Sequence, residues 1–150
     1  MALNQEIQPI EILLVEDNVS EVRLTQLALG ESSVANRLSV VSDGVEALDF
    51  LRRAGRHVEA PRPDIILLDL NLPRKRGVEV LSEIRADPAL KNIPVLVLTN
   101  SRNERDINES YGLQANCYIS KPVDLEGFFT VVKAIEQFWL RTARLPPVPS

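Results

Sequence analysis

Short apolar runs alternate with longer segments of helical periodicity along most of the chain. Most of these runs are nearly continuous in Ile, Leu and Val, which is typical of strands covered on both faces of a parallel sheet. The predicted strands span residues 10–15, 38–41, 64–68, 94–98 and 116–119. The predicted helices span residues 19–29, 44–54, 77–85, 104–111 and 125 to about 141. Five repeats of a strand followed by a helix predict an α/β fold with helices on both faces of a parallel sheet.

Composition and charge narrow the class of protein. The chain has 150 residues, of which 45% are hydrophobic and 25% charged, as expected for one globular domain. A net charge of -4 offers no broad basic surface to nucleic acid. The single cysteine, Cys117, cannot form an internal disulfide, and neither a signal peptide nor a membrane-spanning apolar stretch is present. We therefore expect a cytoplasmic protein that binds neither nucleic acid nor membranes.

Polar side chains follow the predicted strands at their carboxyl ends. Glu16 and Asp17 follow the first strand, Asp69 the third, Thr99 the fourth and Lys121 the fifth. The strand order is taken from known doubly wound folds, in which five strands follow the order 2-1-3-4-5 and ligands bind at the carboxyl ends where the order reverses. In that order the first and third strands are neighbours. The three carboxylates should then converge in one shallow pocket.

Three converging carboxylates require a positive partner, because like charges at close range repel. Mg²⁺ is a hard cation that prefers oxygen ligands, and Asn71 is placed to add its backbone carbonyl. Such an ion would offset the charge that develops on a transferring phosphoryl group. Lys121 could pair with the same group and the Thr99 hydroxyl could donate to it. Asp69 is then the candidate carboxylate nucleophile.

Four sequence motifs carry a resemblance to a known family. Residues 15–18 read VEDN, 67–73 LLDLNLP, 97–101 VLTNS and 118–122 YISKP. In this order and spacing they resemble the receiver domain of two-component response regulators, a flavodoxin-like (βα)5 fold, over residues 9–141. The segments NLPRKRGVEVLSEIR and NCYISKPVD, with a late FWL, are similar to the single-domain regulators of cyanobacterial and bacterial phytochromes. The resemblance implies a receiver domain over residues 1–142, a proline-rich tail over 143–150 and no output domain.

The resemblance also implies a role for each acidic residue of the pocket. Asp69 matches the residue that accepts a phosphoryl group from a histidine kinase, here of the phytochrome type. Asp17 matches the direct Mg²⁺ ligand, Glu16 the neighbour that reaches the ion mostly through water, and Asn71 the position that gives its backbone carbonyl. Glu16 replaces the commoner aspartate. The implied protein is a phosphoacceptor in signalling that takes part in its own Mg²⁺-dependent phosphorylation and dephosphorylation, and not a classical enzyme.

Further matches concern the response to phosphorylation. Thr99 and Tyr118 match a coupled pair in which the hydroxyl moves toward the phosphoryl group and the ring turns inward. Lys121 matches the lysine that pairs with the phosphoryl group. The bond between Lys121 and Pro122 is commonly cis in the family, and we expect it to be cis here. Phosphorylation would then act by changing the surface beside Tyr118.

The last predicted helix is more apolar than a surface helix requires. At about 100° per residue its core-facing side comprises Leu125, Phe128, Phe129, Val132, Ile135 and Trp139. Val131 and Phe138 widen the apolar surface beyond the stripe of about 100° that one buried face needs. Exposed aromatic patches mark contacts with partners. We therefore predict a homodimer formed through this helix and the face around the fifth strand.

A haloacid-dehalogenase-like phosphatase is one alternative, because these enzymes also use an aspartate nucleophile on a parallel sheet. They resemble one another in a second aspartate two residues after the first, which acts as a general acid. The matching position here is Asn71, which cannot take that role. The chain also lacks an inserted cap to enclose a substrate, so this alternative is disfavoured.

Two binding proteins of the same fold class are further alternatives. A pseudo-receiver, which binds partners without phosphorylation, would be expected to lack an acidic residue or the lysine, and here Asp17, Asp69 and Lys121 are all present. A flavodoxin-like flavin carrier needs Ser, Thr and Gly after the first strand to bind phosphate. This chain has Glu16 and Asp17 there, which would repel a phosphate. The receiver remains the favoured prediction, with the pseudo-receiver as its alternative.

Overall fold

The computed structural model describes residues 8–147, so the predicted domain's first seven residues and the tail's last three lie outside the described part. Five parallel strands form a single sheet in the order β2-β1-β3-β4-β5. This confirms the predicted fold class and strand order. The strands are β1 (Ile10–Val15), β2 (Asn36–Val41), β3 (Ile65–Leu68), β4 (Val95–Thr99) and β5 (Cys117–Ser120).

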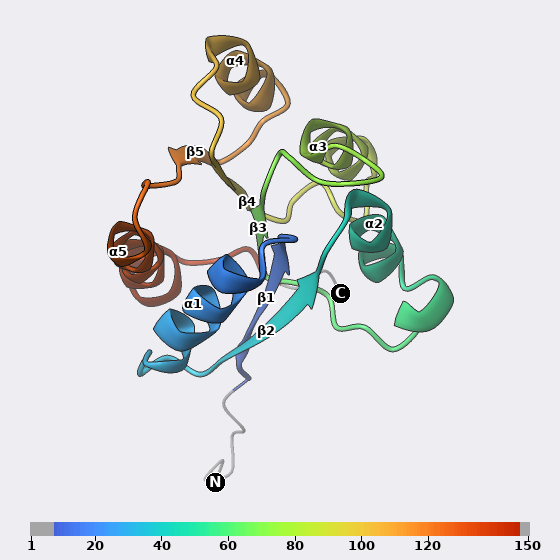
Figure 1. Ribbon diagram of the computed structural model, residues 1–150. Coiled ribbons are helices and arrows are strands. Elements are labelled where there is room, and N and C mark those ends of the chain that lie inside the picture. The colour runs from blue at the N-terminus through green and yellow to red at the C-terminus, as the bar shows by residue number, and fades with distance from the viewer. Residues whose placement is uncertain (1–7, 148–150) are drawn as a thin grey trace, which may run out of the picture.

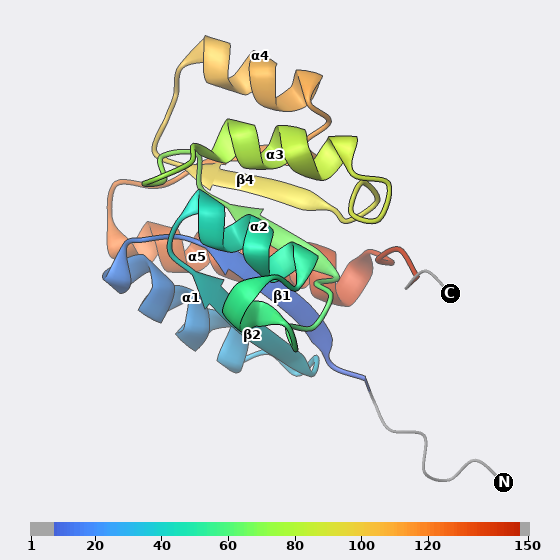
Figure 2. The same ribbon diagram turned by 90° about the vertical axis from the view of Figure 1, so that its right-hand side faces the viewer.

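Helices cover both faces of the sheet, as Figures 1 and 2 show. The helices α1 and α5 lie together on one face, while α2 and α3 lie on the other with α4 beside α3. Within residues 8–147, no helix combines the length and the apolar character needed to cross a membrane. The helices are α1 (Val19–Gly30), α2 (Gly44–Arg52), α3 (Gly77–Ala86), α4 (Glu104–Gly112) and α5 (Leu125–Ile135).

Side chains alternate between the two faces of the sheet along the three central strands, and this produces two hydrophobic cores, one on each face. Successive strand residues point to opposite faces of a sheet, so each buried strand supplies both cores. In β3, for example, Ile66 and Leu68 pack with α2 and α3, whereas Ile65 and Leu67 pack with α1 and α5. All four of these side chains are buried. This explains why the central strands are continuous apolar runs.

The end of the last helix differs from the prediction. The α-helix α5 ends at Ile135 and continues as a π-helix over Glu136–Thr142. In this continuation Leu140 and the carboxylate of Glu136 are buried, and Trp139 is partly buried against the same core. The Ser32 hydroxyl donates to Glu136 at 2.8 Å and satisfies one of its oxygens. Trp139 thus lies on the core-facing side, as the helical period predicted. The prediction is wrong at the start of the helix, because Leu125 was expected to face the core and is exposed.

The predicted cis bond before Pro122 is wrong. No peptide bond in residues 8–147 is cis, so the bond between Lys121 and Pro122 is trans. An X-Pro bond intrinsically favours trans by about 0.5–1 kcal/mol, and only a tertiary constraint can reverse that preference. With the bond in the trans form, the Lys121 side chain still reaches the carboxylates of Glu16 and Asp69.

The start of α3 lies directly against the backbone that carries Asp69. The Gly77 N–H donates to the carbonyl of Leu70 at 3.0 Å. A Cβ added at Gly77 would lie 2.3 Å from the Asp69 carbonyl oxygen and 2.5 Å from the Leu70 Cα. Both distances are far below contact, and the obstructing atoms are backbone. A side chain at Gly77 must therefore displace the loop that positions Asp69.

We expect Gly77→Ala to lower the free energy of unfolding by about 1–3 kcal/mol, the usual cost of overpacking a buried site. Urea denaturation followed by circular dichroism measures it. Gly30→Ala is the matched control, because nothing lies within 4 Å of a Cβ at Gly30, the last residue of α1. Equal urea midpoints for the two variants would show that the close approach of α3 to the Asp69 backbone is not needed for stability.

Candidate functional site

The acidic side chains from the ends of β1 and β3 come together at one edge of the sheet. Glu16 and Asp17 follow β1, and the Asp69 N–H donates to the Val15 carbonyl at 3.1 Å, which fixes the two strand ends side by side. One carboxylate oxygen from each of the three acids lies within 4.8 Å of the other two. Glu16 and Asp69 are buried, whereas Asp17 is exposed.

Lys121 joins this cluster from the end of β5. Its Nζ donates to Glu16 Oε2 at 2.6 Å, to Glu21 Oε2 at 2.7 Å and to Asp69 Oδ2 at 3.2 Å. The lysine side chain is only 1% exposed. A buried charge is tolerated only when it is paired and hydrogen-bonded, and here each of the three ammonium donors has a carboxylate partner.

Burial and mutual charge shift the pKa values within the cluster. The pKa of Glu16 is raised to about 7, because burial, helped by the charge of Asp69, outweighs the opposing hydrogen bond from Lys121. Burial alone would lower the pKa of Lys121, but its bonds to Glu16 and Glu21 and the charge of Asp69 outweigh that effect and leave the pKa raised. Lys121 is therefore a permanent cation in this pocket, and the negative charge of the acids exceeds what it can neutralise.

The donor set fits a hard divalent cation. Three carboxylates offer oxygen ligands within 4.8 Å of one another, and oxygen is what Mg²⁺ and similar ions prefer. Asp17 forms no ion pair within residues 8–147, so its charge is free to face such an ion. Asn71 is exposed, and its N–H donates to Asp69 Oδ1 at 3.2 Å, which fixes the loop beside the cluster.

Thr99 and Tyr118 meet at a common neighbour, Ser101. Thr99 is fully buried, and its Oγ1 accepts a hydrogen bond from the Ser101 N–H at 3.4 Å. The Tyr118 hydroxyl donates to the Ser101 carbonyl at 2.8 Å. The backbone N–H of Lys121 also donates to the Thr99 carbonyl at 2.7 Å. The loop after β4 thus connects the pocket with the partly buried Tyr118 ring on the edge strand.

Glu21 is a site residue that the sequence analysis did not identify. Glu21 stands three residues after the N-cap residue Asn18, the spacing of a capping box, and half of that box is present, since Asn18 Oδ1 accepts from the Glu21 N–H at 3.0 Å. The Glu21 carboxylate binds Lys121 instead of the backbone of Asn18, whose N–H donates to Glu16 at 3.1 Å. Its place in the first turn of the helix that directly follows Glu16 and Asp17 was the available signal.

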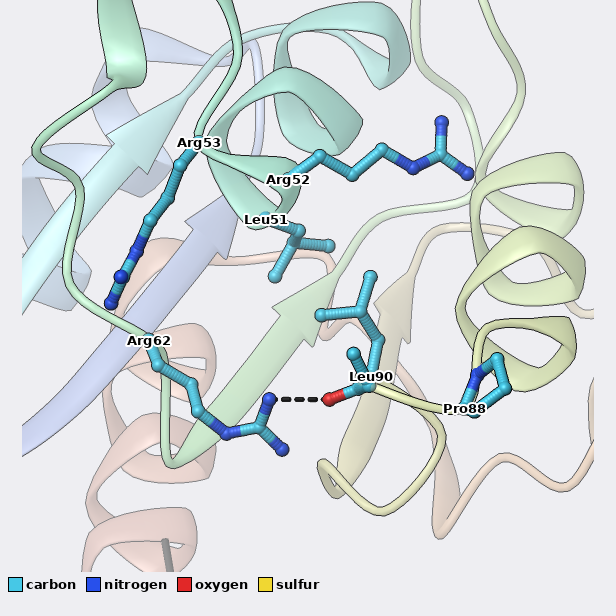
Figure 3. Close-up of a pocket in the computed structure, with 7 residues that line it drawn as sticks. Leu51, Arg52, Arg53, Arg62, Pro88 and Leu90 are labelled. Carbon is cyan, nitrogen blue, oxygen red and sulfur yellow. Dashed lines mark hydrogen bonds between the residues drawn. The ribbon is translucent and has the colours of Figure 1, made fainter. Parts of the chain in front are cut away.

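A second concave region lies at the opposite ends of the strands. An open cavity of about 450 Å³ is lined by residues from the end of α2 and from the loops before β3 and β4 (Figure 3). Its arginines already have partners: Arg52 binds Glu83, Arg53 binds the Ala60 carbonyl and Arg62 the Ala89 carbonyl. These bonds connect neighbouring loops, and the lining contains no acid or nucleophile. The chemistry therefore belongs to the acidic cluster.

Comparisons with known proteins agree with this geometry. Residues 12–133 match the response regulator receiver domain. The chain is 49% identical over 138 residues to the response regulator Rcp1 of Synechocystis sp., covering 92% of this chain and 94% of that one. The solved Mn²⁺-bound form of Rcp1 has a TM-score of 0.91 at 49% identity, covering 93% of this chain and all of that chain.

A second solved structure extends the comparison to a phosphorylated protein. The phosphorylated cyanobacterial phytochrome response regulator RcpA also has a TM-score of 0.91, at 54% identity over 93% of this chain and all of that one. The part of the chain that matches the receiver domain includes the acidic cluster and Lys121. The strand order, the pocket at the carboxyl ends of the strands and these similarities lead to one conclusion: the chain belongs to the response regulator receiver domain family.

Proposed function

We propose that the protein accepts a phosphoryl group on Asp69 from a histidine kinase of the phytochrome type. The observation that carries this proposal is the convergence of Asp17, Asp69 and Lys121 at one edge of the sheet. The similarity to RcpA, which is described as a phytochrome response regulator, supports the choice of kinase. We place the protein in the cytoplasm, which suits its single cysteine.

In this role the Asp69 carboxylate is the nucleophile. Oδ2 faces Lys121 at 3.2 Å, and the N–H of Asn71 holds Oδ1, so the side chain is fixed before the reaction. Lys121 would donate to an oxygen of the incoming phosphoryl group, and fixed donors of this kind lower the barrier most when charge develops in a dry site. Mg²⁺, held by Asp17, Glu16, Asp69 and the Asn71 carbonyl, would neutralise further charge when bound.

The proposed signal leaves the pocket through Thr99. A phosphoryl group on Asp69 would attract the Thr99 hydroxyl, which now accepts from the N–H of Ser101. When that hydroxyl moves, the Ser101 N–H loses its acceptor and the loop of Ser101 can shift. The Tyr118 hydroxyl, which donates to the Ser101 carbonyl, is then freed as well. Phosphorylation would thereby change the surface around β5 and α4. A pseudo-receiver would keep this surface unchanged.

Phosphotransfer from a kinase tests the function directly. A phytochrome-type histidine kinase is first labelled on its histidine, freed of ATP and mixed with the protein in the presence of Mg²⁺. We expect the label to move to the protein rapidly, and much more slowly from a histidine kinase with an unrelated input domain. Label that stays on both kinases would support the pseudo-receiver instead.

We further propose that two copies associate through α5, its π-helical continuation and the face around β5. Phe138 is 54% exposed and stacks edge-on against Trp139, with ring centroids 5.4 Å apart. Val131 is partly buried against the core between α1 and α5, so it adds little to the exposed apolar surface and mainly packs beneath it. Val123 and Leu125, next to β5, are also exposed. A second copy of the chain would cover these apolar side chains.

We expect the wild type to dimerise at micromolar concentration and Phe138→Ala to weaken the dimer, since a buried aromatic is a typical anchor of an interface. Sedimentation velocity with and without beryllofluoride measures association in both states. Val58→Ala is the control, because Val58 is even more exposed than Phe138 and lies outside the proposed interface. A wild type that stays monomeric in both states contradicts the dimer, and dimers insensitive to Phe138→Ala place the interface elsewhere.

A further inference from the structure

Lys121 binds three carboxylates, and the proposed phosphotransfer accounts for only two of them. Its three donors are taken by Glu16, Asp69 and Glu21. Glu16 and Asp69 belong to the acidic cluster that can hold a cation, whereas Glu21 does not. Glu21 nevertheless binds Lys121 at 2.7 Å, across 100 positions of the sequence. The role of this third carboxylate needs an explanation of its own.

Lys121 and a divalent cation would compete for the same carboxylate oxygens of the cluster. Glu16 Oε2 accepts from Lys121, and Oε1 accepts from the Asn18 N–H. Asp69 is likewise engaged on both oxygens, by Lys121 and by the N–H of Asn71. An ammonium and a divalent cation repel each other strongly when they approach one oxygen in a buried site. The ammonium must therefore shift toward another acceptor before these oxygens can face a cation.

Glu21 is the acceptor that the structure provides for this shift. The Lys121 side chain is almost fully buried, so water cannot replace a lost partner, and an unpaired buried charge is strongly destabilising. Glu21 comes from α1, on the edge of the pocket, and is itself partly accessible to solvent. It can therefore keep the ammonium paired without taking part in the cluster.

We propose that Glu21 is a positioning residue that retains the Lys121 ammonium when Glu16 and Asp69 turn to a divalent cation. Glu21 thereby strengthens the binding of that cation and keeps Lys121 in place for the phosphoryl group. This role rests on the proposed function, in which the pocket holds Mg²⁺ during phosphotransfer.

Mg²⁺ titration of the full chain by calorimetry is the primary test. We expect Glu21→Gln to weaken Mg²⁺ binding about five- to tenfold, the lower part of the range typical of coupled sites. Glu126→Gln is the matched control: it removes the same charge from the first turn of α5, where Glu126 is exposed and makes no bond to Lys121. It should change the affinity less than about twofold, as expected for an exposed charge.

A double-mutant cycle with Lys121→Met separates positioning from simple charge. If Glu21 acts by retaining the ammonium, Glu21→Gln loses most of its effect when the ammonium is gone. If Glu21 attracts the cation only through its charge, the effect is as large or larger in the Lys121→Met background, where that charge is no longer neutralised. Lys121→Met alone should bind Mg²⁺ more tightly, because Glu16 and Asp69 are released from the lysine.

A spectroscopic measurement supports the cycle and replaces it if Lys121→Met does not fold. The Nζ resonance of Lys121 is followed by heteronuclear NMR as Mg²⁺ is added. We expect its protons to stay protected from exchange in the wild type and to lose that protection in Glu21→Gln. Equal protection in both proteins, or equal affinities for Glu21→Gln and Glu126→Gln, overturns the proposal. A protein in which Asp17→Asn also leaves Mg²⁺ affinity unchanged would instead contradict the proposed function.

Discussion

Replacing Asp69 by Asn is expected to abolish phosphorylation of the protein by acetyl phosphate and by a histidine kinase. The amide keeps the shape of the side chain but cannot form an acyl phosphate, because it lacks the carboxylate nucleophile. Asp69 is buried within a fixed set of hydrogen bonds, and no other carboxylate in the cluster lies opposite both Lys121 and the loop of Asn71. The loss should therefore be complete.

Intact-protein mass spectrometry after incubation with acetyl phosphate and Mg²⁺ measures the effect. Hydroxylamine should remove the added group from the wild type, as expected for an acyl phosphate, and a chelator should prevent its addition. Asp49→Asn, in α2 and outside the acidic cluster, is the control and should be phosphorylated normally. Undiminished phosphorylation of Asp69→Asn, or full phosphorylation of the wild type in chelator, would refute the assigned nucleophile or the need for the metal.

Asp17→Asn is expected to weaken Mg²⁺ binding by at least about 10- to 100-fold, the range already seen when partners outside the direct ligand shell are lost. Asp17 is exposed at the end of β1 and forms no ion pair in the described chain, so its full charge can face the cation. The Glu16 carboxylate is less free to bind a cation than that of Asp17, because both its oxygens already accept hydrogen bonds from within the protein. Glu16→Gln should therefore cost less affinity than Asp17→Asn.

Titration calorimetry on the two variants and the wild type makes the comparison, with thermal unfolding as a check that each variant is folded. Removing Glu16 also releases Lys121, which then depends on Glu21 and Asp69 alone. A larger loss for Glu16→Gln than for Asp17→Asn would show that Glu16 is the principal ligand. Asp17 would then act on the metal only through its charge.

Local sequence patterns were sufficient for the sheet and for most of the pocket. The central strands are buried on both faces, so their hydrophobicity is continuous and their ends are marked by the first polar residue that follows. Glu16, Asp17, Asp69 and Lys121 all occupy such ends, and parallel strands bring those ends to one edge. The strand order was taken from known folds, since nothing in a strand's own residues specifies its neighbours.

Two features of the backbone differ from what the sequence predicted. The last helix widens into a π-helix at Glu136, whose buried carboxylate accepts a hydrogen bond from Ser32, just beyond the end of α1. The bond before Pro122 is trans, which is the form that an X-Pro bond intrinsically favours. The first of these features depends on packing between distant segments, which no local pattern records.

Glu21 shows most directly what the sequence determined and what only the tertiary structure decided. Its place in the first turn of α1 follows from the cap at Asn18, which is a local signal. Its contact with Lys121 depends on how α1 and the end of β5 approach each other around the sheet. The sequence by itself determined the strands, the caps and the acids that end them, because those depend on neighbours in the chain. The tertiary structure alone decided which carboxylate holds the lysine, because that depends on the distance between elements a hundred residues apart.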